Sequence, residues 1–387
     1  MAAEDGGFRS RRTPSSGAAP SRRGRARRTV VAVTGAASPL GAAVVSAVHE
    51  AGYDVVAVDS TLPDPLEARS GVAWRKVEVA GPEVADGLAG ADVVVHLAAP
   101  TDLEAALAQD PVARRARAVR SAQAVVTAAA AVGARRLVAV TSAMVLGASP
   151  DNPVPLPDDA PLLAPLDSGL VGDLLDVERV LERAPTSHPS LAVAVLRPAA
   201  LVGPGVDTVV TRHFEAPRLL AVRGSAMRWQ FCHVQDAATA VVAAVQHGLS
   251  GPLTCGSEPL LDSPEVEALS GMRRVELPAG LAFATAERLH RVGVLPMPAG
   301  DLAYVVHPWA VGSTRLREVG WQPRRSTAEC LAALLEAVQG RRALVGRRVE
   351  RRDAALGAAG AAVALVGTAA AVRQARARRS RRSRPQA

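Results

Sequence analysis

The sequence predicts an α/β fold whose core is a parallel sheet covered by helices on both faces. Short runs of apolar and β-branched residues alternate with longer alanine-rich stretches along the chain. Buried parallel strands have near-continuous apolar sequences, and their alternation with helices is typical of a doubly wound sheet. The expected strands are residues 29–34, 54–59, 72–79, 92–97 and 136–142, and the expected helices include residues 39–51 and 112–132.

Composition limits the class of protein. The chain has 387 residues, of which 49% are hydrophobic and only 3% aromatic, so Ala, Val and Leu must build the core. This length allows one large domain or two ordinary ones. The three cysteines form no CxxC pair and the eight histidines lack ligand spacing, so we expect neither a disulfide framework nor a metal site. This cysteine usage fits a reducing cytoplasm, where we expect the protein to lie.

Charge is distributed unevenly along the chain. Residues 1–28 carry eight arginines against two carboxylates, and residues 341–387 carry thirteen against two. Because 24 basic and 33 acidic residues remain between them, the overall charge of +8 comes from the tails and not from the predicted domain. Lys76 is the only lysine, so any mechanism that needs a catalytic lysine depends on it.

The two tails have different sequences. Residues 1–28 are rich in Gly, Pro, Ser and Arg, lack the apolar run of a signal peptide, and are expected to be disordered. In the C-terminal tail, residues 354–372 are uncharged and mostly alanine, with the length of a membrane span but few Leu and Val. Two interpretations stay open: membrane association aided by the flanking arginines, or an Ala-rich helix that is soluble or docks on the domain. Neither tail has interleaved aromatic residues, so we do not expect nucleic-acid binding.

A glycine-containing turn follows the first expected strand. Residues 34–41 read TGAASPLG and lead directly into a helix. Gly35 permits a tight turn and Gly41 a close approach of helix and strand, while amides at the helix start can hold a pyrophosphate. Ser38 stands where a middle glycine is usual, and its hydroxyl can itself donate to phosphate. The position between strand and helix indicates a dinucleotide-binding, Rossmann-type fold.

Asp59 ends the second expected strand, eighteen residues beyond Gly41. A carboxylate there accepts hydrogen bonds from the adenosine ribose hydroxyls and repels a 2′-phosphate. The sequence therefore predicts NAD as the cofactor rather than NADP. The alternative interpretation is a simple turn residue at the end of a strand.

Several segments in order resemble the extended short-chain dehydrogenases/reductases, the NAD-dependent epimerase/dehydratase family. They are VTGAASPLG (33–41), DVVVHLAAP (92–100), RRLVAVTSAMVLG (135–147), VLRPAALVGPG (195–205) and FCHVQDAATAVVAA (231–244). The GVDT (205–208) and VGWQP (319–323) stretches are most similar to actinobacterial, nucleotide-sugar epimerase-like members. The resemblance implies an NAD-binding domain over residues 29–204 and a smaller substrate subdomain over residues 205–340, from which residues 231–249 return to the core.

The resemblance also implies roles for individual residues. Ser142 corresponds to the residue that hydrogen-bonds the reacting oxygen of the substrate. The pyrophosphate would be lined by Gly35, Ser38, Pro39, Leu40 and Gly41, and the adenosine ribose would meet Asp59 and Ser60. The adenine would be flanked by Glu78 and Val79. The dinucleotide would lie over Leu97, Ala98 and Ala99, with its nicotinamide near Pro198 and Ala199.

The family's catalytic Tyr-x-x-x-Lys pair has no counterpart in this sequence. When the helix over residues 168–182 is anchored on Glu178, Leu170 takes the tyrosine position and Leu174 the lysine position. The only tyrosines, Tyr53 and Tyr304, have no lysine four residues later. Because the tyrosine is the acid/base and the lysine lowers its pKa, ordinary hydride-transfer chemistry is expected to be severely impaired.

Other polar residues are candidate replacements for the missing acid/base pair. Asp173 and Asp176 lie on the same helix and are expected to face solvent. His96 is expected to be a packed core histidine, and His233 and Asp236 to be structural, with His233 bonded to a neighbouring loop. Arg212, Arg218, Arg223 and Arg228 are candidates for contacts with a substrate phosphate, or ordinary surface arginines.

Three functions stay open from sequence alone. The first is an NAD-dependent enzyme acting on a nucleotide sugar or another small hydroxyl compound with a non-standard acid/base. The second is a non-catalytic NAD(H)-binding sensor or regulatory protein, and the third is a membrane-tethered scaffold with a vestigial pocket. A homodimer is a further expectation.

Overall fold

The computed structural model describes residues 28–62, 70–166, 169–292, 295 and 297–345, together with Ala2; of residues 341–345 it describes the backbone only. The expected disordered tail and the segment over residues 354–372 therefore lie outside the described residues. Within the described part of the chain, no helix is long and apolar enough to cross a membrane.

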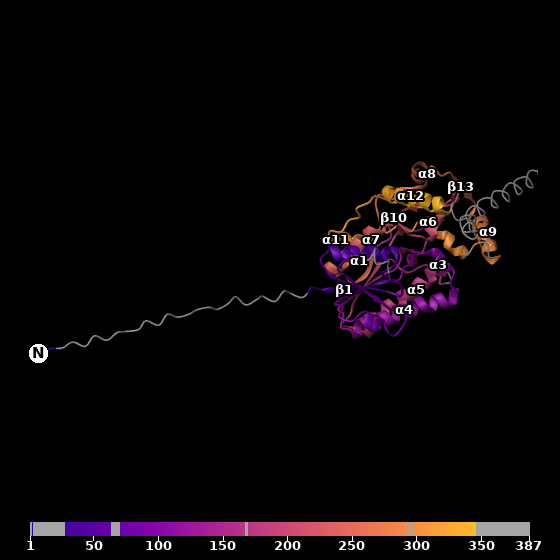
Figure 1. Ribbon diagram of the computed structural model, residues 1–387. Coiled ribbons are helices and arrows are strands. Elements are labelled where there is room, and N and C mark those ends of the chain that lie inside the picture. The colour runs from indigo at the N-terminus through magenta and orange to yellow at the C-terminus, as the bar shows by residue number, and fades with distance from the viewer. Residues whose placement is uncertain are drawn as a thin grey trace, which may run out of the picture.

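A seven-stranded parallel sheet has the strand order β11-β6-β5-β4-β1-β2-β3. It lies at the centre of the molecule, where β1 is labelled among the surrounding helices (Figure 1). Its strands are β1 (Val30–Thr34), β2 (Asp54–Asp59), β3 (Val72–Lys76), β4 (Val93–Leu97), β5 (Arg136–Val140), β6 (Ala192–Pro198) and β11 (Gly251–Cys255). The predicted α/β fold class is confirmed, and all five strands expected from sequence are present. Four of them are shorter than expected: β1 and β4 each begin one residue later, at Val30 and Val93, while β3 ends at Lys76 and β5 at Val140.

Helices cover both faces of the sheet, as the apolar strands require. Val31 and Val33 of β1 belong to a core cluster shared with α1 and α7, whereas Ala32 belongs to a second cluster shared with α4 and α5. Side chains along a strand alternate between the two faces, so one apolar strand supplies both clusters. These helices are α1 (Pro39–Glu50), α2 (Val84–Gly87), α4 (Pro111–Ala131), α5 (Gly169–Ser187) and α7 (Val234–Gln246).

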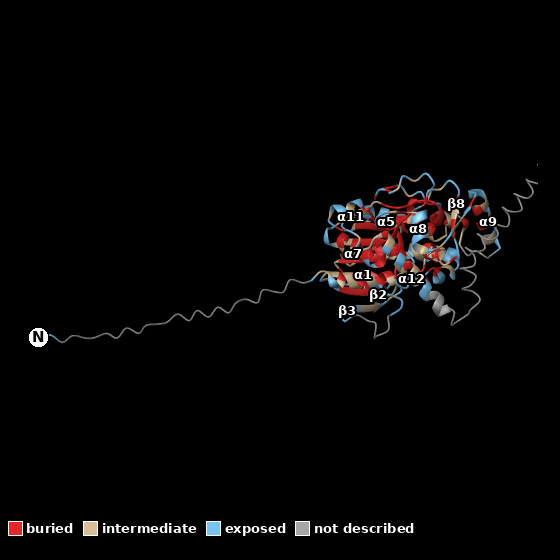
Figure 2. Ribbon diagram, turned by 90° about the horizontal axis from the view of Figure 1, so that it is seen from above, coloured by how far each residue is buried: buried red, intermediate tan, exposed pale blue. Residues whose placement is uncertain are grey.

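The C-terminal part adds short elements beyond the carboxyl ends of the strands. Three two-stranded sheets join β7 with β10, β9 with β12, and β8 with β13. The chain returns to the core through α7, which packs on α1, and continues into β11 at the edge of the central sheet. Buried residues concentrate in the interior of the molecule, on the sheet and on the sides of the helices that cover it (Figure 2).

The remaining elements have the following bounds: α3 (Leu103–Leu107), η1 (Ala143–Leu146), β7 (Ala200–Val202), α6 (Val209–His213), β8 (Leu219–Val222), β9 (Arg228–Trp229), β10 (Phe231–His233), β12 (Leu261–Asp262), α8 (Ser263–Ser270), β13 (Arg274–Leu277), α9 (Ala279–Arg291), η2 (Ala299–Leu302), α10 (Ala303–Val306), α11 (Thr314–Glu318) and α12 (Thr327–Val345).

Candidate functional site

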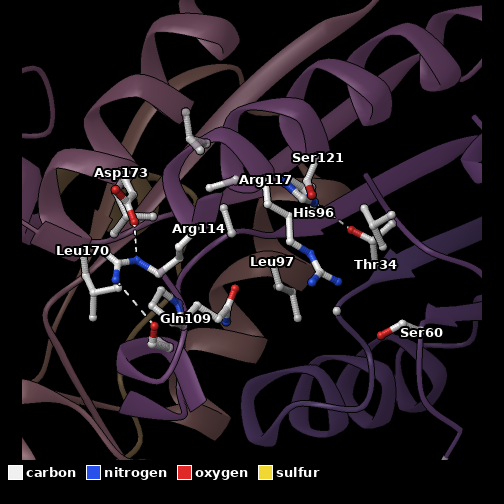
Figure 3. Close-up of a pocket in the computed structure, with 18 of the residues that line it drawn as sticks. Thr34, Ser60, His96, Leu97, Gln109, Arg114, Arg117, Ser121, Leu170 and Asp173 are labelled. Carbon is white, nitrogen blue, oxygen red and sulfur yellow. Dashed lines mark hydrogen bonds and ion pairs between the residues drawn. The ribbon is translucent and has the colours of Figure 1, made fainter. Parts of the chain in front are cut away.

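A cavity of about 350 Å³ opens at the carboxyl ends of β1, β2 and β4, and we call it the main cavity (Figure 3). Ligands of open α/β sheets bind at this edge of the sheet. Seven of the residues predicted to meet the cofactor line the main cavity: Gly35, Asp59, Ser60, Glu78, Val79, Leu97 and Ala98.

The turn after β1 brings the start of helix α1 close to the backbone of residues 35 and 36. Gly35 has a φ of +76°, in the left-handed region that favours glycine. A Cβ added at Gly41 would collide with the Gly35 carbonyl oxygen, so helix α1 can start this close to β1 only with glycine there.

Ser38 is the N-cap of α1. Its hydroxyl donates to the Gly35 carbonyl at 2.8 Å and accepts from the Gly41 amide at 3.0 Å, so its proton serves the loop and not a phosphate in this structure. Pro39 has no amide hydrogen, and the Ala42 amide donates to the Ser38 carbonyl. Among the described residues, the Leu40 amide is therefore the one first-turn donor without a partner, and it fits a single phosphate contact.

Asp59 lies between the turn and the main cavity. Its carboxylate accepts hydrogen bonds from the Ala37 amide at 3.0 Å and the Thr61 amide at 3.1 Å, and it is half-buried. Arg117 of α4 is paired with Glu78 at 2.7 Å on the same side of the cavity, and both are about half-exposed. This end of the cavity therefore combines two fixed carboxylates with one arginine.

His96 lines the floor of the main cavity and is also a core residue. Its Nδ1 lies 2.8 Å from Thr34 Oγ1, and only 4% of its surface is exposed. Burial lowers the pKa of His96 to about 4, so the imidazole is neutral near pH 7. A neutral, hydrogen-bonded ring agrees with the expected packed core histidine.

Helix α5 places Leu170 and Leu174, the residues at the positions of the family's Tyr and Lys, beside two cavities. Leu170 and Leu174 both line the main cavity and a second cavity beside it. The helix is held by Glu178, which is buried, accepts from Thr141 Oγ1 at 2.6 Å and pairs with Arg197 Nη2 at 2.6 Å. Two apolar side chains therefore stand where the cavities meet.

The expectation that Asp173 faces solvent is wrong. Its carboxylate is 8% exposed and pairs with Arg114 Nε of α4 at 2.7 Å, and both residues line the main cavity (Figure 3). The reason is that α4 packs on this side of α5 and covers it. Asp176 is also paired with a residue of α4, Arg115, at 2.6 Å, and is one-quarter exposed.

The second cavity has a volume of about 60 Å³ and is mostly apolar. Ser142, the N-cap of η1, contributes a hydroxyl that accepts from the Met144 amide at 3.2 Å. The other residues lining it are Ala99, Pro100, Leu103, Met144, Leu170, Val171, Leu174, Ala199, Ala200, Leu201, Asp207, Thr208, Val209, Val210 and Asp301.

Asp301 of η2 is 1% exposed, and its Oδ1 has no hydrogen-bond partner among the described residues. Burial raises its pKa to about 7; nearby Arg114 opposes this rise and nearby Asp173 adds to it. A carboxyl that is half-protonated at neutral pH can donate or accept a proton.

Arg212 and Arg218 line a third cavity of about 70 Å³ on the other side of Asp301. Arg212 pairs with Asp207 at 2.7 Å and with Glu215 at 3.4 Å, so carboxylates already neutralise it. Arg218 forms no ion pair within the described part of the chain. It is therefore the better candidate of the two for binding an anionic group of a substrate.

Three remaining residues lie away from the cavities or serve the fold. Pro198 ends β6 opposite Cys255 and lines neither the main nor the second cavity. His233 caps α7 and accepts from Arg325 Nη1 at 3.2 Å, in the loop before α12. Asp236 is fully buried and accepts from the Arg324 amide at 3.0 Å. The roles of His233 and Asp236 here are structural.

The sequence profile of the NAD dependent epimerase/dehydratase family matches residues 31–254, more than half of the chain. The protein belongs to this family, whose members use a nicotinamide cofactor. An uncharacterised protein of Mycobacterium tuberculosis is 27% identical over 308 residues, covering 78% of this chain and 81% of the relative. The 3-diazoavenalumate denitrifying reductase of a Streptomyces species is 34% identical over 233 residues, covering 58% and 74%.

Solved structures show the same fold at low sequence identity. The UDP-glucose 4-epimerase of Thermotoga maritima with UDP-glucose has a TM-score of 0.61 at 18% identity, over 82% of this chain and all of the epimerase chain. MoeE5 in complex with UDP-glucose and NAD has a TM-score of 0.60 at 23% identity, over 81% and 99%.

Arg114 and Asp301 are the site residues that sequence reasoning missed. Arg114 is one of several arginines in a long Ala- and Arg-rich helix, so nothing in the pattern distinguishes it. Asp301 is an isolated acid, about 130 residues after Leu170 and Leu174 in the sequence and outside any motif.

Proposed function

We propose that the protein binds a nicotinamide dinucleotide in the main cavity and transfers hydride to or from a small substrate in the second cavity, without the Tyr-x-x-x-Lys pair. The observation that carries this proposal is that Leu170 and Leu174 line both cavities, so a ligand in one lies against a ligand in the other. Ser142 offers a hydroxyl to a substrate oxygen there. The Streptomyces relative, named a reductase, supports reduction as the reaction class.

The cofactor preferred in this proposal is NAD(H). Asp59 and Glu78 both line the main cavity, and two carboxylates oppose the extra phosphate of NADP(H). Arg117 is paired with Glu78, which reduces its attraction for that phosphate.

A nucleotide sugar is the second candidate substrate. It is supported by Arg218, which lines the third cavity next to Asp301 without an ion-pair partner among the described residues, and by structural neighbours that hold UDP-glucose. The small volume and apolar lining of the second cavity favour a smaller, less polar substrate instead.

Titration of NADH and NADPH into the full-length protein tests the proposal. We expect NADH to bind at least tenfold more tightly than NADPH, and premixed UDP-glucose to leave the NADH affinity unchanged. Binding of neither dinucleotide would contradict the proposal. Binding of NADH without oxidation by any carbonyl compound would favour the sensor hypothesis.

A further inference from the structure

One buried cluster has members that line the main cavity and a member that lines the second cavity, and the proposed function does not use it. Its members come from three distant segments: Arg114 from α4, Asp173 from α5, and Asp301 with Tyr304 from η2 and α10. Arg114 and Asp173 neutralise each other at 2.7 Å. Asp301 has no such partner, and neither its Oδ1 nor the Tyr304 hydroxyl has a hydrogen-bond partner among the described residues.

Burying a carboxyl group without a hydrogen-bond partner costs folding free energy, and such groups are uncommon in native proteins unless they have a function. Asp301 lines the second cavity together with Ser142, Leu170 and Leu174. It therefore shares one apolar cavity with the serine hydroxyl and with the two leucines that replace the usual acid/base pair.

We propose that Asp301 is the proton donor of this site and gives its proton to the oxygen of a carbonyl substrate in the second cavity. The proposal rests on the proposed function. A reduced nicotinamide dinucleotide held in the main cavity would supply the hydride that the carbonyl carbon accepts. The O–H bond of Asp301 then breaks, its electron pair stays on the carboxylate, and a new O–H bond forms from the carbonyl π pair. Water returns a proton to Asp301 after the product alcohol leaves.

The charges around Asp301 suit this role. Its pKa of about 7 keeps roughly half of the molecules protonated at neutral pH. The nearby histidine does not compete, because burial lowers the pKa of His213 to about 4. The charged and titratable groups around Asp301 are Arg114, Asp173 and Tyr304, Asp207 in the second cavity, and Arg212, His213 and Arg218 in the third.

Proton release on cofactor binding tests this role without knowledge of the substrate. Oxidised nicotinamide carries a positive charge and reduced nicotinamide does not, so only NAD⁺ should lower the pKa of a neighbouring Asp301. For a lowering of about one unit, NAD⁺ binding at pH 7 releases about 0.4 proton, and the Kd of NAD⁺ falls about fivefold between pH 6 and 8. We expect no proton release with NADH.

The experiment is calorimetric titration of the full-length protein with NAD⁺ and NADH, in buffers of different ionisation enthalpy. Asp301→Asn should abolish the proton release, while Asp159→Asn, at an exposed position outside the three cavities, should keep it. Equal release in wild type and Asp301→Asn would overturn the proposal while leaving the proposed function intact. If Asp301→Asn fails to fold, a wild-type Kd for NAD⁺ that does not change with pH overturns it instead. Binding of neither cofactor would overturn both.

Discussion

Glu178 of α5 and Arg197 of β6 form a buried, two-pronged ion pair, with Arg197 Nε 3.0 Å from both carboxylate oxygens and Nη2 2.6 Å from Oε2. The pair fixes the rotation of α5 about its axis, because it ties one face of the helix to the central sheet. Leu170 and Leu174 lie two turns and one turn before Glu178 on that helix. Their position at the cavities is therefore set by a structural contact that persists without the catalytic pair.

Glu178→Ala should lower the free energy of unfolding by about 3–5 kcal/mol, since it leaves Arg197 buried without its partner. Chemical denaturation measures this change. Glu182→Ala, one turn further on the exposed side of α5, is the matched control and should change stability by less than about 0.5 kcal/mol. Equal effects of the two substitutions would contradict the structural role of the pair.

Replacing Leu170 by Tyr and Leu174 by Lys together should not create strong epimerase activity. The lysine would be buried among apolar side chains, and Asp173 beside it is already paired with Arg114. We expect a lower melting temperature and turnover of UDP-galactose close to background, measured by conversion to UDP-glucose. Leu170→Tyr alone is the control for volume. Strong turnover by the double variant would show that only these two side chains are missing.

Asp59→Ala should reduce the preference for NADH over NADPH by about tenfold or more, because it removes the carboxylate that opposes the 2′-phosphate. Fluorescence titration with both cofactors gives the ratio. Asp54→Ala, at the exposed start of the same strand, should leave the ratio unchanged. An unchanged ratio in Asp59→Ala would support the turn interpretation, in which Asp59 only holds the Ala37 and Thr61 amides.

Pro39→Ala should tighten NADH binding about threefold to tenfold, the effect of about one added hydrogen bond. The substitution gives the first turn of α1 a second free amide beside that of Leu40. Pro111→Ala makes the same change at the start of α4, at a position that lines none of the three cavities, and should not alter the affinity. No gain in Pro39→Ala would mean that the pyrophosphate does not contact this turn.

The fold was predictable because each strand carries its own signal, an apolar run that the sheet buries on both faces. The place of Leu170 and Leu174 at the site followed from the family resemblance, which puts the catalytic pair at these two positions; their spacing of four adds only that they share a helix face. Asp173 was misjudged because helical periodicity identifies a second face but not what covers it, and here α4 supplies Arg114. Asp301 could not be found, because only the tertiary fold brings η2 beside α5.

The pH dependence of stability should separate Asp301 from the other acids. Folding raises its pKa from 3.8 to about 7, so the native state holds a proton that the unfolded state loses over that range. The stabilising contribution is complete below about pH 4 and is lost as the pH rises toward 7. The maximum loss is about 4 kcal/mol for a shift of about three units.

Denaturant unfolding of wild type and Asp301→Asn at several pH values between 4 and 8 measures this effect. The difference in unfolding free energy should shift against wild type as the pH rises, because the amide has no proton to lose. Asp159→Asn should follow wild type at every pH. If the unfolding free energies of wild type and Asp301→Asn change with pH in parallel, the carboxyl of Asp301 is already ionised at pH 5. Asp301 would then carry no proton to donate at neutral pH.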